Sequence, residues 1–177
     1  MSLYVKYHLF MGRARCRGPK PDERVSMFNV VIWNDRGFGA RVKSDFLFNE
    51  LCNNHVSLVA FLEPKQASSK ISEYAHRLKV CGFVHGVPPN SHIWLFWEDH
   101  ISVDLLSTTD QSINIKITVG IQEFFFSIIY AKCNSQDMES SWSDLYGFNP
   151  DAAPWIVGGD FNIVASTEEK KGGGAFP

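Results

Sequence analysis

The stretch PWIVGGDFN, Pro154 to Asn162, is the most informative part of this sequence about its fold. In it an apolar run leads into two glycines, then the acid Asp160 and the amide Asn162. A short apolar run bounded by turn residues is typical of a buried strand. Paired glycines allow another backbone to approach closely. Because residues two apart in an extended segment point to the same side, we expect Asp160 and Asn162 to face one ligand.

Three apolar runs further upstream also end in a polar residue. Asn34 follows VVIW, Glu63 follows VAFL, and Tyr130 follows FSII. Each residue alone has an ordinary explanation: a turn cap for Asn34, a solvated loop carboxylate for Glu63 and a sheet-edge aromatic for Tyr130. A rigid strand fixes the position of the residue at its end, however. The four strand ends together therefore predict one functional site.

The composition is that of a globular protein. The chain has 177 residues, which fits one domain, and 45% hydrophobic and 14% aromatic residues, which suffice for a sizeable core. Its net charge of −2 gives no overall attraction to nucleic acid. No apolar run approaches the ~18 residues of a membrane-spanning helix. The four cysteines are scattered, which favours free thiols over a zinc ribbon or a disulfide framework.

The hydrophobic pattern alternates strands with helices. In residues 113–119, isoleucines alternate with polar residues, which predicts an antiparallel strand with one buried face. Residues 120–133 then follow as its hairpin partner, with the turn predicted near Gly120–Glu123. Helical spacing is seen in residues 68–83, through Ile71, Ala75 and Leu78, and in residues 135–148, whose predicted inward side chains are Met138, Trp142 and Leu145. Helices around central hairpins favour an α/β sandwich over a simple Rossmann sheet.

The first 26 residues differ from the rest. Five basic residues precede the first acidic one, Asp22, no helical period is sustained, and Gly18–Pro19 is a break. We interpret residues 1–26 as a disordered leader outside the fold, with an organelle transit peptide as the alternative. The folded domain is then predicted to span residues 27–177.

The quoted motifs resemble a known family. VVIWNDRG, VAFLEPK, FFFSIIYAKC, PWIVGGDFNIV and EEKKGGGAFP occur in this order, with HIWLFW and DQSINIKI between them. From about Met27 to Pro177 they resemble the endonuclease domain of plant LINE-type (non-LTR) retrotransposons. That domain belongs to the endonuclease/exonuclease/phosphatase superfamily and is similar to apurinic endonucleases. The resemblance implies a four-layer α/β sandwich, with two packed mixed β-sheets flanked by helices.

The resemblance also implies roles for the strand-end residues. Glu63 matches the metal-binding glutamate, and Asn34 the asparagine that supports the metal and the phosphate. Asp160 matches the aspartate that orients or deprotonates the attacking water, while Asn162 and Tyr130 match residues that contact the phosphate. The implied cofactor is Mg²⁺, or Mn²⁺ in its place, which suits oxygen ligands. The implied partner is DNA, the implied compartment is the nucleus, and no membrane is involved.

One departure from the family concerns a histidine. Members of the family carry a histidine, oriented by an acid, near the end of the domain, and none of the six histidines here occupies that position. We therefore expect a C-terminally truncated, metal-dependent phosphodiesterase or DNA endonuclease of retrotransposon origin, missing its C-terminal strands and weak or inactive as this chain. His85, His92 and His100 lack the spacing of zinc ligands.

Two alternatives remain open at this stage. A non-catalytic relic of the same fold could bind nucleic acid or protein through exposed aromatic residues and a basic loop at Lys170 and Lys171. A superfamily hydrolase could instead act on a phosphorylated small molecule, which the resemblance to retrotransposon domains disfavours. Salt-sensitive DNA binding that survives removal of magnesium would favour the relic.

Overall fold

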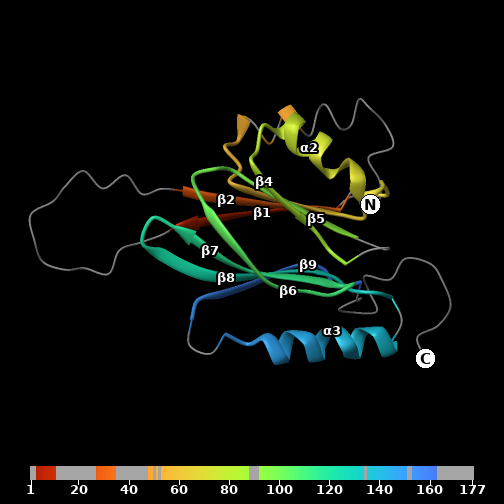
Figure 1. Cartoon of the computed structure of the whole chain (residues 1–177). Coiled ribbons are helices and arrows are strands. Elements are labelled where there is room, and N and C mark those ends of the chain that lie inside the picture. The colour runs from red at the N-terminus through yellow and green to blue at the C-terminus, as the bar shows by residue number, and fades with distance from the viewer. Residues whose placement is uncertain are drawn as a thin grey trace, which may run out of the picture.

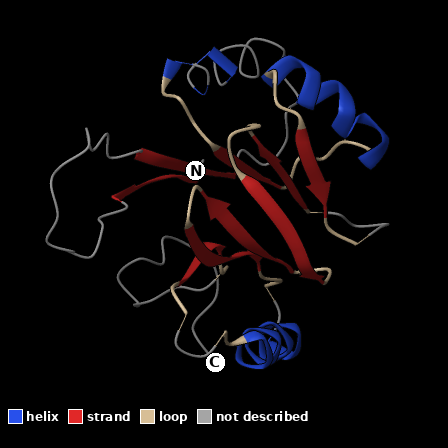
Figure 2. Ribbon diagram, turned by 60° about the vertical axis from the view of Figure 1, so that its left-hand side comes forward, coloured by secondary structure: helices blue, strands red, loops and turns tan. Residues whose placement is uncertain are grey.

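Four layers of secondary structure make up the protein. The computed structural model describes residues 3–10, 27–34, 48–49, 51, 53–87, 92–133, 135–150 and 153–162. Two β-sheets face each other, with helix α2 (Ile71–Leu78) on one outer side and helix α3 (Ser135–Phe148) on the other (Figure 1). Figure 2 shows the same order, with helices outside and strands between them. The predicted α/β sandwich of two mixed sheets is thus confirmed, while the loss of C-terminal strands stays a prediction.

The first sheet has five strands in the order β1-β2-β3-β5-β4. Their bounds are Leu3–Phe10 for β1, Met27–Asn34 for β2, Leu58–Leu62 for β3, Gly82–His85 for β4 and Ile93–Trp97 for β5. Strands β2 and β3 run parallel, with Asn34 paired to Leu62, and the other pairings are antiparallel. Residues 34 and 63 are therefore brought to the same edge of this sheet.

The second sheet has four strands in the order β6-β7-β8-β9. Their bounds are Ser102–Thr108 for β6, Ser112–Val119 for β7, Gln122–Tyr130 for β8 and Trp155–Asp160 for β9. The hairpin of β7 and β8 turns at Gly120 and Ile121, as the sequence predicted. Strands β8 and β9 run parallel with Tyr130 paired to Asp160, so both residues end their strands at one edge.

The prediction that residues 1–26 lie outside the fold is wrong for Leu3–Phe10. This segment forms β1, which pairs antiparallel with β2 along its whole length, from Leu3 opposite Asn34 to Phe10 opposite Met27. From Val5 to Leu9, apolar and basic side chains alternate, which is the two-residue period of a strand. The absence of a helical period was therefore no sign of disorder. Residues 11–26 lie outside the described residues.

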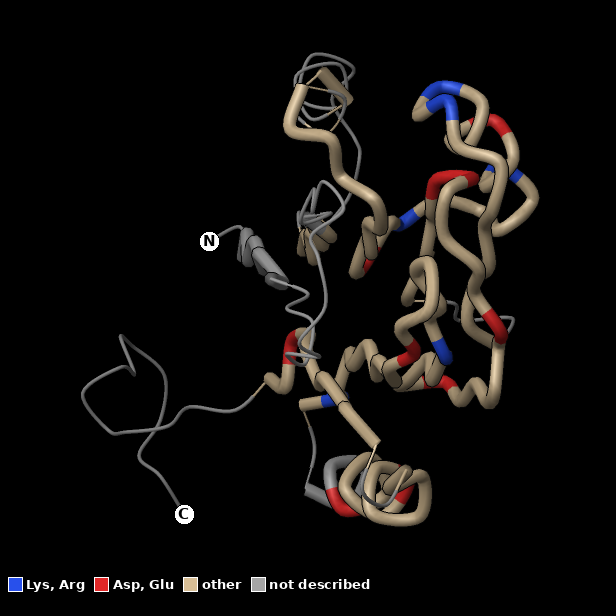
Figure 3. The backbone as a smooth tube through the Cα atoms, turned by 90° about the vertical axis from the view of Figure 1, so that its left-hand side faces the viewer, with Lys and Arg blue, Asp and Glu red and all other residues tan. Residues whose placement is uncertain are grey.

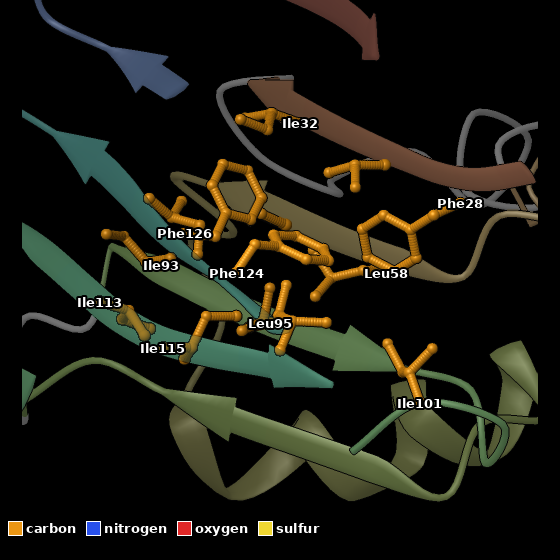
Figure 4. Packing of buried hydrophobic residues seen from close by; sticks show 14 of the residues in the cluster. Phe28, Ile32, Leu58, Ile93, Leu95, Ile101, Ile113, Ile115, Phe124 and Phe126 are labelled. Atoms are coloured by element: carbon orange, nitrogen blue, oxygen red, sulfur yellow. The ribbon is translucent and has the colours of Figure 1, made fainter. Parts of the chain in front are cut away.

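The main core fills the space between the two sheets. Ile113, Ile115 and Ile117 of β7 are all 0% exposed, which confirms the predicted buried face of that strand. Across the interface the ring of Phe28 meets that of Phe124 edge to face, with centroids 5.3 Å apart. Figure 4 shows Phe28, Ile113, Ile115 and Phe124 among the side chains that converge from strands of both sheets. Burial of this apolar surface holds the sheets together and so fixes the relative positions of their edges.

Helix α2 covers the outer face of the first sheet. Ile71, Ala75 and Leu78 are buried there, as their spacing predicted. The serines that precede the helix do not cap it. They form a short 3-10 turn, Ser68–Lys70, and no side chain caps the start of α2.

Helix α3 covers the second sheet less completely than its sequence predicted. Leu145 is buried, but Trp142 is 41% exposed, so its predicted inward position is wrong. Its indole instead stacks on the ring of Phe161, with centroids 5.7 Å apart and planes at 14°. The side chain of Met138 lies outside the described residues.

A groove of about 390 Å³ lies between α3 and β9. Its lining is mainly apolar and includes Trp142, Tyr146, Trp155 and Phe161. Tyr146 is 81% exposed at this groove. Neither described helix is both long and apolar enough to cross a membrane.

Candidate active site

The candidate site lies where the carboxyl ends of two parallel strand pairs come together. Asn34 is the last residue of β2 and pairs with Leu62, the last residue of β3. Glu63 directly follows Leu62. Tyr130 and Asp160 end β8 and β9 and pair with each other. Parallel strands bring their carboxyl ends to one edge of a sheet, where loops are free to carry polar groups. Each sheet therefore contributes two of the residues that the sequence singled out.

A hydrogen bond joins the two sheets at this edge. The side-chain amide Nδ2 of Asn34 donates to Oδ2 of Asp160 at 2.7 Å, although the two residues lie 126 positions apart. Asn34 is only 3% exposed. A hydrogen bond to a carboxylate in a partly buried place is among the stronger ones. It holds the carboxylate of Asp160 in a fixed orientation between the sheets.

Asp160 and Asn162 are linked by a turn, and not by an extended chain as the sequence had predicted. Strand β9 ends at Asp160, and Asn162 has a left-handed φ of 49°. The backbone N–H of Asn162 donates to Oδ1 of Asp160 at 2.9 Å, which is an Asx-type turn. The Asn162 side-chain amide donates to the carbonyl oxygen of Ala131. The two residues thus lie together as expected, but for a different physical reason.

The glycines of the GGD motif allow β9 to lie close against β8. Gly159 has a φ of 150°, and a Cβ atom built on it would lie 1.9 Å from the carbonyl oxygen of Ile129. Only glycine fits at that distance. The close approach also lets the N–H of Ala131 donate to the carbonyl of Asp160 at 2.9 Å. Gly159 therefore positions Asp160 against the end of β8.

Glu63 and Tyr130 form the other half of the site. Glu63 has a left-handed φ of 50°, an unusual backbone for a non-glycine residue, and such strain clusters at functional positions. Burial first, and then the hydrogen bond between its hydroxyl and Glu63, raise the pKa of Tyr130 well above its ordinary value of 10.0. The charge of Asp160 raises this pKa further. The Nζ atom of Lys65 lies 3.7 Å from the Glu63 carboxylate.

All five residues singled out by the sequence are therefore connected. Asn34, Asp160 and Asn162 share hydrogen bonds, and the interaction with Glu63 and the charge of Asp160 both raise the pKa of Tyr130. Their positions agree with the expectation of a single site. The catalytic and metal-binding roles implied by the resemblance remain predictions.

Two further residues lie at the site: Gln111, which the sequence analysis missed, and His92, which it considered only as a zinc ligand. Gln111 is buried, and its carbonyl accepts from the N–H of Tyr130 at 2.8 Å while its Oε1 accepts from the N–H of Lys132 at 2.7 Å. The carbonyl of His92 accepts from the N–H of Glu63 at 2.8 Å, and its ring centroid lies 5.0 Å from that of Tyr130. Each residue directly precedes an apolar strand, which is the signal that could have identified it.

The raised pKa of Tyr130 predicts a loss of stability in alkali. In the unfolded chain this phenol releases its proton at a lower pH than in the folded protein, so its contribution is present below about pH 10 and lost as the pH rises above it. We expect Tyr130→Phe to weaken the alkaline fall in the free energy of unfolding, measured with urea between pH 8 and about pH 11. Burial also raises the pKa of Tyr74, which accounts for the dependence that remains.

The exposed Tyr146 supplies the control for this experiment. Tyr146→Phe makes the same chemical change at an exposed ring and so controls for the substitution itself. If Tyr130→Phe and Tyr146→Phe give the same slope, the hydroxyl of Tyr130 is not held by Glu63 as described.

Comparison with known proteins supports the fold. The sequence matches no protein-family model and no curated protein. Among solved structures, it is similar to the endonuclease domain of TRAS1, a telomere-specific non-LTR retrotransposon, with a TM-score of 0.62 and 15% identity, covering 78% of this chain and 62% of that domain. It is also similar to D. rerio TDP2 complexed with a single-strand DNA product, with a TM-score of 0.59 and 14% identity, covering 77% of this chain and 61% of that one.

Two further structures extend this similarity. The human Nocturnin catalytic domain matches with a TM-score of 0.56 and 16% identity over 80% of this chain and 67% of that one. An endonuclease/exonuclease/phosphatase family protein from Bacteroides thetaiotaomicron matches with a TM-score of 0.53 and 10% identity over 76% of this chain and 63% of that one. The chain thus spans about three-fifths of the length of the TRAS1 and TDP2 structures. This chain has the fold of the endonuclease/exonuclease/phosphatase superfamily.

Proposed function

We propose that this chain is a metal-dependent phosphodiesterase-type domain that acts on DNA and derives from a non-LTR retrotransposon. The observation that carries the proposal is the hydrogen-bonded set of Asn34, Asp160 and Asn162 beside the Glu63–Tyr130 pair. Two of the structures with this fold support it: the TRAS1 domain is an endonuclease of a non-LTR retrotransposon, and D. rerio TDP2 is complexed with a single-strand DNA product. The motif order supports the retrotransposon origin.

The donors at the site suit a hard divalent cation. Glu63 and Asp160 contribute carboxylates and Asn34 an amide, whereas among the described residues no three His, Cys, Asp or Glu side chains gather into a metal-binding group. Magnesium prefers oxygen ligands and keeps several waters, so one or two protein ligands are enough. We propose that Glu63 and Asn34 would hold Mg²⁺, or Mn²⁺ in its place. When bound, the ion would neutralise phosphate charge and acidify a water.

The remaining residues would position the substrate and the attacking water. In this proposal Asp160, fixed by its bonds from Asn34 and Asn162, orients the water that attacks phosphorus. In this proposal Tyr130 and Asn162 would contact the phosphate. The hydroxyl of Tyr130 and one amide hydrogen of Asn162 are already engaged within the chain, however, by Glu63 and by Ala131. Because one missing preorganised donor lowers a rate by about 10²–10³, we propose weak turnover.

Nicking of supercoiled plasmid by the purified full chain tests this function. We expect slow nicking in millimolar magnesium, and we expect a chelator, Glu63→Ala or Asp160→Ala to return it to background. Glu73→Ala, a change on the exposed face of α2, is the matched control and should nick like wild type. Nicking that ignores the chelator and both site variants would refute the proposal. Rapid nicking would refute only the part of the proposal that expects weak turnover.

The aromatic groove between α3 and β9 favours a second candidate, a non-catalytic binding module of the same fold. Exposed aromatic residues in an apolar groove are typical of a protein-binding surface. Figure 3 shows Lys and Arg dispersed among Asp and Glu along the described backbone, which favours a protein over nucleic acid as the partner. The predicted basic loop at Lys170 and Lys171 lies outside the described residues. Binding of a partner protein that is lost in Tyr146→Ser but kept in Asp160→Ala would support this candidate.

A further inference from the structure

The imidazole of His92 lies at the site and makes no side-chain hydrogen bond to another described residue. The residue is half-buried, immediately before β5, and its ring lies against that of Tyr130 with centroids 5.0 Å apart and planes tilted by 36°. Its backbone carbonyl is held by the N–H of Glu63. Neither ring nitrogen has a hydrogen-bond partner among the described residues. A half-buried imidazole placed in this way has a donor to offer to a ligand.

The other polar groups at the site are engaged with one another. One amide hydrogen of Asn34 goes to Asp160, one of Asn162 goes to the carbonyl of Ala131, and the hydroxyl of Tyr130 goes to Glu63. The nearest described cation, Lys65, pairs with Glu63. Two carboxylates repel a phosphate, and the cation proposed above would offset their charge but supply no hydrogen-bond donor. A phosphodiester bound here would therefore be held better with a further donor from within the site.

We propose that His92 is a phosphate-binding residue, whose imidazole N–H donates to a non-bridging oxygen of the phosphodiester held beside Tyr130. The proposal rests on the proposed function, because it places the phosphate at the same site. The ring packing against Tyr130 would hold the imidazole in place, and the bond from Glu63 would anchor its backbone. Either ring nitrogen can act, since an imidazole carries at least one N–H in every protonation state.

The same geometry assigns binding to His92, and not proton delivery. In a histidine that serves as a general acid or base, a carboxylate typically holds the second ring nitrogen and fixes the tautomer. No described carboxylate hydrogen-bonds to the ring of His92. Its substitution should therefore weaken substrate affinity more than the rate at saturating substrate.

A binding titration distinguishes the contribution of the His92 N–H donor from that of its aromatic ring. The probe is a thymidine dinucleotide with a phosphorothioate linkage, which resists hydrolysis, added to the full chain in millimolar magnesium and followed by NMR chemical shifts. His92→Phe keeps an aromatic ring against Tyr130 but removes the N–H, and we expect it to raise Kd about 10-fold or more. His92→Asn restores a donor and should stay within about threefold of wild type. His76→Phe, on the exposed side of α2, is the matched control.

The outcomes distinguish this inference from the function on which it rests. Wild-type binding that is lost in Glu63→Ala, which removes the carboxylate proposed to hold the cation, and weakened in His92→Phe supports both. If Glu63→Ala loses the probe while His92→Phe binds it like wild type, only the role of His92 is overturned. If wild type does not bind the probe, both fail. Equal loss in His92→Phe and His92→Asn, with unchanged melting temperatures, would overturn the donor role, because shape alone would then explain the effect.

Discussion

Gly159→Ala is expected to destabilise the protein by about 3 kcal/mol or more and to remove any activity of the candidate site. The added Cβ would lie 1.9 Å from the backbone oxygen of Ile129, and a backbone atom within a sheet cannot rotate away as a flexible side chain can. The φ of 150° at this residue is also strained for alanine. Strand β9 must therefore move away from β8, which carries Asp160 out of reach of Asn34.

Urea unfolding followed by tryptophan fluorescence measures this loss. Gly147→Ala, near the end of α3, is the matched control, because nothing lies within 4 Å of a Cβ built there. That change should leave stability unchanged or raise it by up to about 1 kcal/mol, as alanine favours a helix over glycine. If both variants unfolded at the same urea concentration as wild type, the close packing of β8 and β9 would be contradicted.

Asn34→Asp is expected to destabilise the protein by about 2 kcal/mol or more at pH 7, and by less in acid. The change replaces the donor of the 2.7 Å bond with a second carboxylate facing Asp160. Two neighbouring carboxylates repel each other when both are ionised, and the buried position of Asn34 leaves little water to screen them. Below about pH 4 at least one is protonated, so the repulsion disappears. The difference in stability between Asn34→Asp and wild type should therefore become smaller as the pH falls.

Asn34→Ala provides the control for the charge. This change removes the same hydrogen bond but adds no carboxylate, so the difference in stability from wild type should vary less with pH. Thermal melts at pH 4 and pH 7 compare the variants, and millimolar magnesium should narrow the Asn34→Asp gap at pH 7 if the cation binds between the carboxylates. Equal gaps for Asn34→Asp and Asn34→Ala at both pH values would show that Asn34 does not face Asp160.

Local patterns in the sequence were enough to predict several buried elements and the polar residues at their ends. The alternating isoleucines of β7, the helical spacing of Ile71 and Leu78, and the apolar run before Asp160 each depend on neighbours along the chain. Local periodicity controls these features, because a strand or helix buries one face with a fixed repeat. Asn34, Glu63, Tyr130, Asp160 and Asn162 could be selected for the same reason, since each sits at or just beyond a strand end.

The contacts among those residues depend on the tertiary structure. The bond from Asn34 to Asp160 spans 126 positions, and no local pattern contains its geometry. The exposure of Trp142 follows from its stacking on Phe161, a partner that belongs to another element. The place of β1 depends on pairing with β2, and the proximity of His92 to Tyr130 depends on the packing of two sheets. Contacts between distant segments are set by the packed core, whose shape is a property of the whole chain.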